Sequence, residues 1–346
     1  MKKFVGKLAL FLLLLALVVI PLNVCVDPYN VFHADSIRDN GVEPNKNYIK
    51  TQFILEHQDE YDSYLFGSSR AGFIDVSKLP DGSWYNFSYS EGLPKEQCET
   101  LRTLISQGEI PKQVYLSIDN ISFLVDPAYH EGQLYRKPFP YEGSLMDKLR
   151  FYAVYLDSIT TLESLAVIRA HEGNTEELRA RMYSTGCENL NLDVTFDEAS
   201  TKPYWAQYYE PRIDEAVADV REFKELCEEY DIELTVFTNP LYITTYERSV
   251  DKGYLDFLEK LAHVTPFYNF SGYNEISMNN SYYFETSHFT PEAANIIMNV
   301  IENGGNAHDM QAQGFGYYVT EDNLEDFMKI IRHQVYVTGI LQYPGA

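Results

Sequence analysis

Two short stretches of this 346-residue chain carry residue types that together can activate a nucleophile. The first, GSSRAG at 67–72, places Ser69 directly after an apolar run, and the second, ETSH at 285–288, places Glu285 three residues before His288. A carboxylate beside an imidazole orients the ring and stabilises its protonated form, which a general base for a serine hydroxyl requires. Ser69, His288 and Glu285 are therefore the candidate catalytic residues.

Each stretch also has a purely structural interpretation. Ser is a favoured helix cap, so Ser68 and Ser69 alone are better explained as capping the turn that follows. ETSH can also be a surface loop with an incidental histidine, although its signal is sharper, because it lies immediately before a helix that Thr290 and Pro291 open. A chemical role requires the two stretches to meet in space.

The segments around both stretches alternate between β and α patterns. Such a rhythm predicts a parallel sheet, and sites in parallel sheets form beyond the carboxyl ends of the strands, where GSSRAG begins. Short apolar or β-branched runs predict strands at 61–67, 83–88, 112–119, 232–240 and 266–272. Helical spacing of apolar residues predicts helices at 93–108, 211–232, 251–264 and 291–304.

The N-terminus differs from the rest of the chain. Lysines at positions 2, 3 and 7 precede an uninterrupted apolar run from Leu8 to Ile20, and the length of Phe4–Val26 is close to the ~20 residues needed to span a bilayer. No A-x-A-like cleavage site follows, and Val24 before Cys25 does not suit a lipoprotein signal. We expect a retained single-pass anchor with a cytoplasmic N-terminus and an extracytoplasmic domain; a cleaved signal is the alternative.

Four parts are expected along the chain. They are an anchor at 1–26, a polar, turn-rich linker at 27–60, an α/β domain at 61–313, and a C-terminal extension at 314–346 that contains one helix. A helical and irregular segment at about 143–202 interrupts the α/β rhythm, and we expect it to cap one end of the sheet.

Charge and cysteine content narrow the function classes. The net charge of -24 repels nucleic acid and anionic lipid surfaces. Beyond Cys25 at the membrane edge, Cys98, Cys187 and Cys227 allow at most one disulfide, and no spacing indicates a metal site. We expect neither a metal nor another cofactor.

The two motifs in this order resemble the SGNH, or GDSL-like, hydrolase and acyltransferase superfamily. The resemblance implies a three-layer α/β/α, flavodoxin-like fold, with Ser69 as nucleophile and Ser68 in the Asp position of G-D-S. Glu285 takes the place of Asp in D-x-x-H, and His288 is the implied base. The resemblance covers residues 61–300.

The oxyanion-hole positions of this superfamily fall on less typical residues. Gly92 matches the glycine whose backbone N–H serves the hole, but the G-x-N-D motif reads Ser117, Asp119 and Asn120 at its Gly, Asn and Asp positions. An ionised Asp119 facing an oxyanion would oppose it, and loss of one donor typically costs ~100 to 1,000-fold in rate. Either Asn120 supplies the donor, or the hole relies on the backbone N–H groups of Ser69 and Gly92.

The anchor followed by DPYNVF, the GSSRAG form of the nucleophile loop and YNFSG near the histidine motif look like membrane-anchored SGNH proteins of bacterial envelopes. Those proteins assist D-alanylation of teichoic acids or O-acetylation of exopolysaccharide, often beside a membrane-bound O-acyltransferase. The resemblance implies serine-dependent acyl transfer or ester hydrolysis on an envelope polymer. The alternatives are a catalytically silent module that binds an envelope glycan or the acyltransferase, and a plain secreted esterase or lipase.

Three residues are candidates for substrate contact. Trp205 in the aromatic-rich segment 202–210 and Tyr283 beside the histidine motif offer flat faces for sugar rings, although core packing is the better explanation for at least half of the aromatic residues in these segments. Arg70 could pair with an anionic substrate, and an ion pair with an internal carboxylate is the favoured alternative.

Overall fold

The computed structural model describes residues 2–193, 195–197, 210–305 and 313–338. The chain divides into two compact units. Residues 1–56 and 132–183 form one, here called the helical unit, and residues 57–131 and 184–346 form the other, here called the sheet unit.

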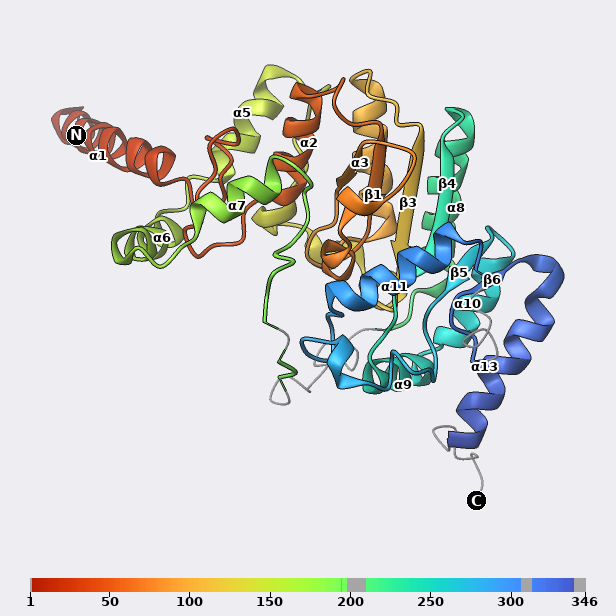
Figure 1. Cartoon of the computed structure of the whole chain (residues 1–346). Helices are drawn as coiled ribbons and strands as arrows, with labels where there is room; N and C mark the ends of the chain where they lie inside the picture. The colour runs from red at the N-terminus through yellow and green to blue at the C-terminus, as the bar shows by residue number, and fades with distance from the viewer. Residues whose placement is uncertain (1, 194, 198–209, 306–312, 339–346) are drawn as a thin grey trace. The chain divides into compact units, whose positions relative to one another are not determined.

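The sheet unit is built on a six-stranded, mostly parallel β-sheet with helices (Figure 1). The strand order is β2-β1-β3-β4-β5-β6, and only β6 runs antiparallel, against β5. The strands are β1 (Ser63–Phe66), β2 (Trp84–Asn86), β3 (Gln113–Ile118), β4 (Glu233–Thr238), β5 (Phe267–Asn269) and β6 (Tyr317–Val319). The predicted strands through β5 are confirmed, with narrower bounds than the sequence patterns suggested.

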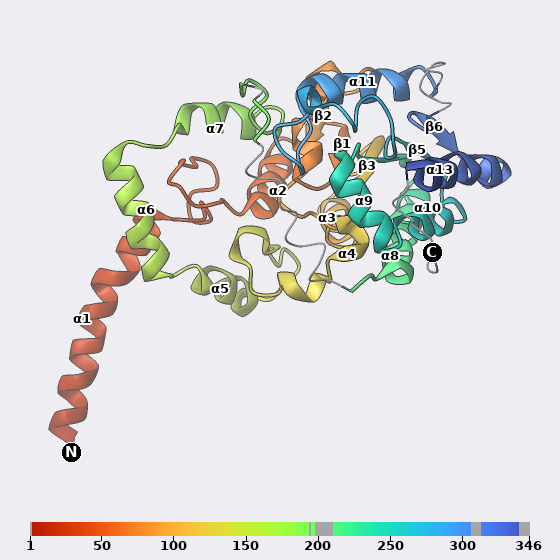
Figure 2. The ribbon, with the colours of Figure 1, turned by 90° about the horizontal axis from the view of Figure 1, so that it is seen from below.

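Helices lie on both faces of this sheet, as the view in Figure 2 shows, with α11 on one face and α3 and α8 on the other. Alternation along the buried strand β1 explains this arrangement. Phe66 stacks edge-on against Phe223 of α8, whereas Leu65 belongs to the hydrophobic cluster that contains Ile297 of α11. The helices of this unit are α3 (Pro94–Ser106), α4 (Ile121–Leu124), α8 (Ile213–Glu229), α9 (Ile243–Asp251), α10 (Tyr254–Ala262), α11 (Pro291–Glu302) and α13 (Leu324–Thr338).

The sequence pattern predicts an extension outside the α/β domain at residues 314–346, and the structure corrects this prediction. The predicted helix is present as α13, but β6 precedes it and adds a strand to the sheet. Phe327, Ile331 and Val335 of α13 are fully buried, and the Phe327 ring packs edge-on against Phe267 of β5. A three-residue strand after residues rich in glycine carries too weak a pattern to be recognised in the sequence.

The helical unit contains most of the segment that was expected to be a linker. Ile37, Ile49 and Ile54 are fully buried, and Asn45 donates a hydrogen bond to the carbonyl of Lys137 at 2.7 Å. Residues 27–56 therefore fold with residues 132–183, and the linker prediction is corrected. The helices of this unit are α1 (Lys2–Val26), α2 (Lys46–Glu56), α5 (Leu145–Val154), α6 (Ser158–Ala170) and α7 (Thr175–Met182).

The predicted insertion at 143–202 is divided between the two units. Its helices belong to the helical unit, which begins at 132 and ends at 183. The residues after 183 pack in the sheet unit, where the backbone N–H of Asn86 donates to Thr185 and that of Glu188 donates to Gly72, both at 2.8 Å.

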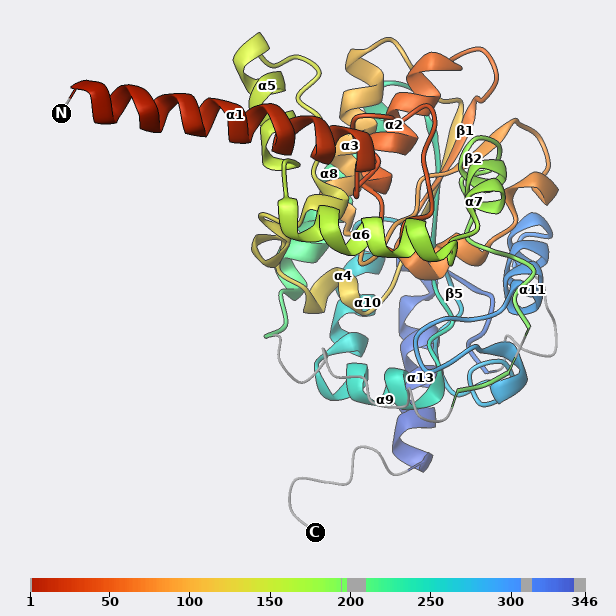
Figure 3. The same ribbon diagram turned by 90° about the vertical axis from the view of Figure 1, so that its left-hand side faces the viewer.

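The N-terminal helix α1 (Figure 3) contains an apolar stretch that is long enough to cross a membrane. Within Lys3–Val26, a stretch of 18 residues has a mean hydropathy of 2.9, and 11% of that stretch is buried within the protein. An apolar N-terminal helix of this length is typical of a signal anchor or a signal sequence.

Candidate active site

Ser69 lies directly beyond the carboxyl end of β1. Gly67 and Ser68 turn the chain, and Ser69 begins the short 3₁₀ helix η1 (Ser69–Phe73), capped by the Ser68 hydroxyl, which accepts from the Arg70 N–H. A side chain at Gly67 would place its Cβ 2.6 Å from Cβ of Ala71, so only glycine fits this turn. The Ser69 side chain is half-buried at this edge of the sheet.

The ETSH stretch forms a closed loop ahead of α11. The backbone N–H of Phe284 donates to the His288 carbonyl at 3.0 Å, and that of Thr290 donates to Tyr282 at 2.8 Å. Thr290 caps α11 and Pro291 is its first residue, as the sequence predicted. Thr245 of α9 also donates its hydroxyl to the Thr286 carbonyl at 2.7 Å. These bonds fix the position from which the His288 side chain projects.

The structure brings the two stretches together, although 219 positions separate them in the sequence. The Ser69 Oγ lies 2.8 Å from Nε2 of His288. On the other side of the ring, Nδ1 of His288 forms a short hydrogen bond with Oε1 of Glu285. This serine, imidazole and carboxylate chain has the geometry of a nucleophile, a general base and a group that orients the base.

Glu285 is held in its ionised form. Burial raises the pKa of Glu285, but the bond to His288, the charge of His288 and the backbone N–H groups of Ser287 and His288 outweigh burial and leave that pKa below its usual value of 4.5. The backbone donors lie 2.5 Å and 2.9 Å from the carboxylate oxygens. Glu285 is therefore an anion above that value and fixes Nδ1 of His288 as the protonated nitrogen.

Arg70, the residue after the candidate nucleophile, points inward and is 2% exposed. Its Nη1 lies 2.9 Å from Oδ2 of Asp119 and donates to Oδ1 of Asn120 at 3.0 Å. Its Nε donates to the Ser287 carbonyl at 2.7 Å, and Nη2 donates to the Ser287 hydroxyl at 3.2 Å. Arg70 thus joins the nucleophile turn, the end of β3 and the ETSH loop. This corrects its assignment as a substrate contact in favour of the internal ion pair.

Asp119 is buried beneath the nucleophile turn. Its Oδ2 accepts from the Ser68 hydroxyl at 2.8 Å and from Nδ2 of Asn239 at 3.0 Å, in addition to the pair with Arg70. Burial raises the pKa of Asp119, but the Arg70 charge and these hydrogen bonds outweigh it and lower that pKa below 3.8. The carboxylate is therefore compensated within the protein and is corrected from an oxyanion-hole residue to part of the support under Ser69.

Neither Asn120 nor Gly92 presents the donor that was predicted for an oxyanion hole. Asn120 is fully buried, and its Nδ2 donates to the Ser249 hydroxyl at 2.7 Å. The Gly92 N–H donates to the Tyr89 carbonyl at 3.1 Å within a turn. Among the described residues, none accepts a hydrogen bond from the backbone N–H of Ser69, which leaves that group as a candidate oxyanion donor.

Gly92 serves this edge of the sheet in another way. A Cβ at Gly92 would lie 2.7 Å from the carbonyl oxygen of Gly67, next to the nucleophile turn. Atoms at that separation overlap, so the close approach of these two loops requires glycine at position 92. The residue is important to the site because it packs against the turn that positions Ser69.

The aromatic residues proposed for sugar contact divide into two cases. Tyr283 is fully buried and stacks edge-on against Tyr242, so core packing explains it and its assignment as a substrate contact is corrected. Trp205 lies outside the described residues, as do the other aromatic residues of the segment 203–209.

Asn239 is a residue of the site that the sequence analysis missed. It follows β4, is fully buried, donates to Asp119 and accepts the Ser117 hydroxyl at 2.8 Å. The signal that could have identified it is its place directly after a buried strand, at the same edge as Ser69 and Asp119.

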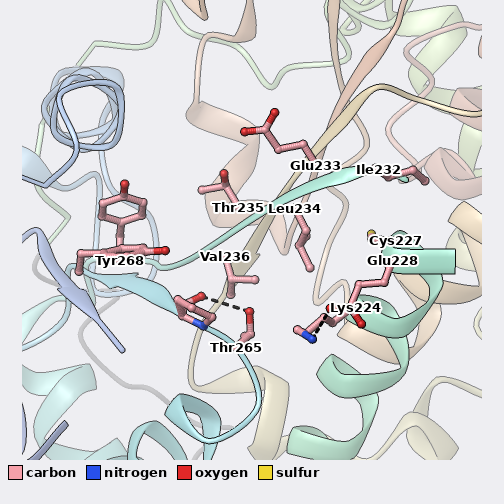
Figure 4. A pocket seen from close by; sticks show the side chains of 12 residues that line it. Lys224, Cys227, Glu228, Ile232, Glu233, Leu234, Thr235, Val236, Thr265 and Tyr268 are labelled. Carbon is pink, nitrogen blue, oxygen red and sulfur yellow. Dashed lines mark hydrogen bonds and ion pairs between the residues drawn. The ribbon is translucent and has the colours of Figure 1, made fainter. Parts of the chain in front are cut away.

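Other parts of the described surface are separate from this site. A cavity of about 420 Å³ lies between α8, the amino-terminal half of β4 and Tyr268 of β5 (Figure 4). Ser69 lies instead beyond the carboxyl end of β1. No group of three or more His, Cys, Asp or Glu side chains among the described residues could hold a metal ion. All four cysteines are free thiols.

No protein-family model matches this chain, and no curated protein sequence matches it.

Proposed function

We propose that this protein is a membrane-anchored, serine-dependent acyltransferase or esterase of SGNH-like fold that acts on ester groups of a cell-envelope polymer. The observation that carries the proposal is the hydrogen-bonded chain from Ser69 Oγ through His288 to Glu285. The strand order 2-1-3-4-5 over the parallel part of the sheet supports the fold, since this is the flavodoxin-like order. O-acetyl and D-alanyl esters are the substrate class that the resemblance implies.

The chemistry follows from the three side chains. Nε2 of His288 takes the Ser69 proton as Oγ attacks the carbonyl carbon of an ester or thioester. The resulting imidazolium gives its proton to the leaving oxygen or sulfur as the tetrahedral intermediate collapses, and an acyl-serine remains. A glycan hydroxyl or water then attacks the acyl carbon and loses its proton to His288, and that proton returns to Ser69 as the acyl group leaves. Glu285 stabilises the imidazolium in both steps.

The position of the anchor supports an extracytoplasmic site. Lysines at 2, 3 and 7 precede the apolar part of α1, so the positive-inside rule places the N-terminus in the cytoplasm and the remaining chain outside. A membrane-bound O-acyltransferase is a partner of the right chemistry, because an acyl donor made in the cytoplasm must first cross the membrane.

A second function is favoured by the state of the oxyanion positions. Asp119, Asn120 and Gly92 are all engaged within the protein, which leaves fewer donors for an oxyanion than an efficient acyl-transfer site employs. A catalytically silent module that binds an envelope glycan or an acyltransferase would retain the fold without needing these donors.

Intact-mass spectrometry of the full-length protein in detergent, after exposure to a fluorophosphonate, separates the two functions. We expect one adduct on the wild-type chain that Ser69→Ala and His288→Ala both lose. Ser77→Ala, which removes an exposed serine outside the site, is the matched control and should label fully. A folded wild-type chain that takes no label, or label that persists in Ser69→Ala, would contradict the enzymatic proposal.

A further inference from the structure

The helical unit has its own connection to the end of α1. Asn23, a buried polar residue near the C-terminal end of that helix, accepts a hydrogen bond from the Thr161 hydroxyl of α6 at 2.8 Å. Its Nδ2 lies 3.4 Å from Oγ of Ser158. The α6 helix therefore packs against the C-terminal end of α1 (Figure 3). Any bilayer around α1 would end near the level of α6.

The α5 helix packs against the residues that directly follow α1 in the chain. Tyr155, the C-cap of α5, packs edge-on against Tyr29, and Tyr152 stacks on Phe32. Phe151 and Tyr155 are buried and form the inner face of α5, whereas Leu145 and Leu149 lie outside that face.

The outward faces of α5 and α6 are apolar. Leu145 and Leu149 of α5 are 75% and 54% exposed, and Ile159 and Leu162 of α6 are 75% and 61% exposed. Together the two helices are apolar enough for a membrane span, but a bend of 58° separates them. Large apolar side chains that are exposed on neighbouring helices mark a contact site in a protein dissolved in water.

The charges of these helices differ from those of the whole chain. The α5 helix carries one Asp against one Lys and one Arg, and α6 carries one Glu against one Arg. In a chain of net charge -24, this surface is therefore close to neutral. A nearly neutral surface can approach phosphatidylcholine headgroups without the repulsion that the rest of the chain would experience.

We propose that α5 and α6 lie on the outer surface of the bilayer and place Leu145, Leu149, Ile159 and Leu162 at the boundary between headgroups and acyl chains. The occupant of this surface is lipid, because α6 packs directly against α1, the helix that is long and apolar enough to span a membrane. The inference rests on the membrane-spanning role of α1 but not on the chemistry of Ser69. It gives the helical unit the role of holding the chain close to the membrane surface.

Nitroxide accessibility tests this placement in the full-length protein. Leu149→Cys and Leu162→Cys are made in a Cys25→Ser background, since Cys98, Cys187 and Cys227 are buried. Each variant is spin-labelled in phosphatidylcholine nanodiscs and probed with oxygen, which concentrates in lipid, and with a water-soluble nickel complex. Leu13→Cys in α1 is the lipid reference, and Glu176→Cys on the acidic first turn of α7 is the water reference. Should Leu162→Cys fail to fold, Ile159→Cys replaces it.

We expect the labels at Leu149 and Leu162 to be accessible to oxygen and protected from nickel, as the label at Leu13 should be. The label at Glu176 should be accessible to nickel and less accessible to oxygen. Nickel access equal to that at Glu176 would overturn the proposal, because the surface would then face water. Protection from both reagents would also overturn it, because a second copy of the chain would then cover the helices. A Leu13 label open to nickel would show that α1 does not span the bilayer, and the fluorophosphonate result would be unaffected.

Discussion

Replacing Arg70 with methionine tests the internal support of the site. Arg70→Met leaves the Asp119 carboxylate buried without its cation, since these side chains are 2% and 1% exposed and lie 2.9 Å apart. Breaking a buried pair on one side typically costs about 3–5 kcal/mol in the free energy of unfolding. For a domain of 150–250 residues, that loss lowers the midpoint of thermal unfolding by roughly 6–20 °C.

The same substitution should also impair the site itself. It removes the bonds from Arg70 to Ser287, which neighbours His288, so the ETSH loop loses a tether. We expect loss of fluorophosphonate labelling at temperatures well below unfolding. Arg70→Lys keeps the positive charge near Asp119 but loses the forked geometry, so it should retain more of the stability than of the labelling.

A double-mutant cycle supplies the refuting result. Asp119→Asn should itself destabilise the protein, because it leaves the buried Arg70 charge uncompensated. Arg70→Met combined with Asp119→Asn should lower the unfolding midpoint by less than the sum of the two single changes, since neither buried charge then remains. Additive effects, or a change below about 1 kcal/mol for Arg70→Met, would show that the pair does not support the site.

Three further predictions follow from the same contacts. Glu285→Gln should slow hydrolysis of a chromogenic acetyl ester by up to roughly 10⁴-fold with little change in substrate affinity, because a neutral amide does not stabilise the His288 imidazolium. An unchanged rate would remove Glu285 from the mechanism. Gly92→Ala should lower the unfolding midpoint by the equivalent of about 1–3 kcal/mol, because its Cβ would lie 2.7 Å from the Gly67 carbonyl oxygen; full stability in calorimetry would contradict that packing. The folded-state pKa of Asp119 is below its usual value, so the stability that its ionised form contributes is present above about pH 4 and is lost as the pH falls through the lowered pKa. The unfolding midpoint of Asp119→Asn should therefore depend less steeply on acid pH than that of the wild-type protein. Identical slopes for the two proteins would contradict this assignment.

Local sequence patterns determined much of the sheet unit. The strand that ends at Phe66 and the cap formed by Thr290 and Pro291 were recognisable because short apolar runs and helix-start residues act on their nearest neighbours. The candidate residues Ser69, Glu285 and His288 were identified by type and spacing, because carboxylate and imidazole three residues apart can meet within one loop.

Only the tertiary structure decided which residues from distant parts of the chain lie in contact. The distance between Ser69 and His288 depends on how β1 and the α11 loop meet at one edge of the sheet, and no local pattern encodes it. From the sequence, Asp119 could either oppose an oxyanion or neutralise Arg70. The directions in which the Asp119 and Arg70 side chains point decide between these roles, and in the structure the two form an ion pair. The segment at 27–56 is polar enough to be taken for a linker, but its scattered isoleucines become a core only where residues 132–183 supply the other half. Burial is a property of two surfaces in contact, and a sequence presents those surfaces one at a time.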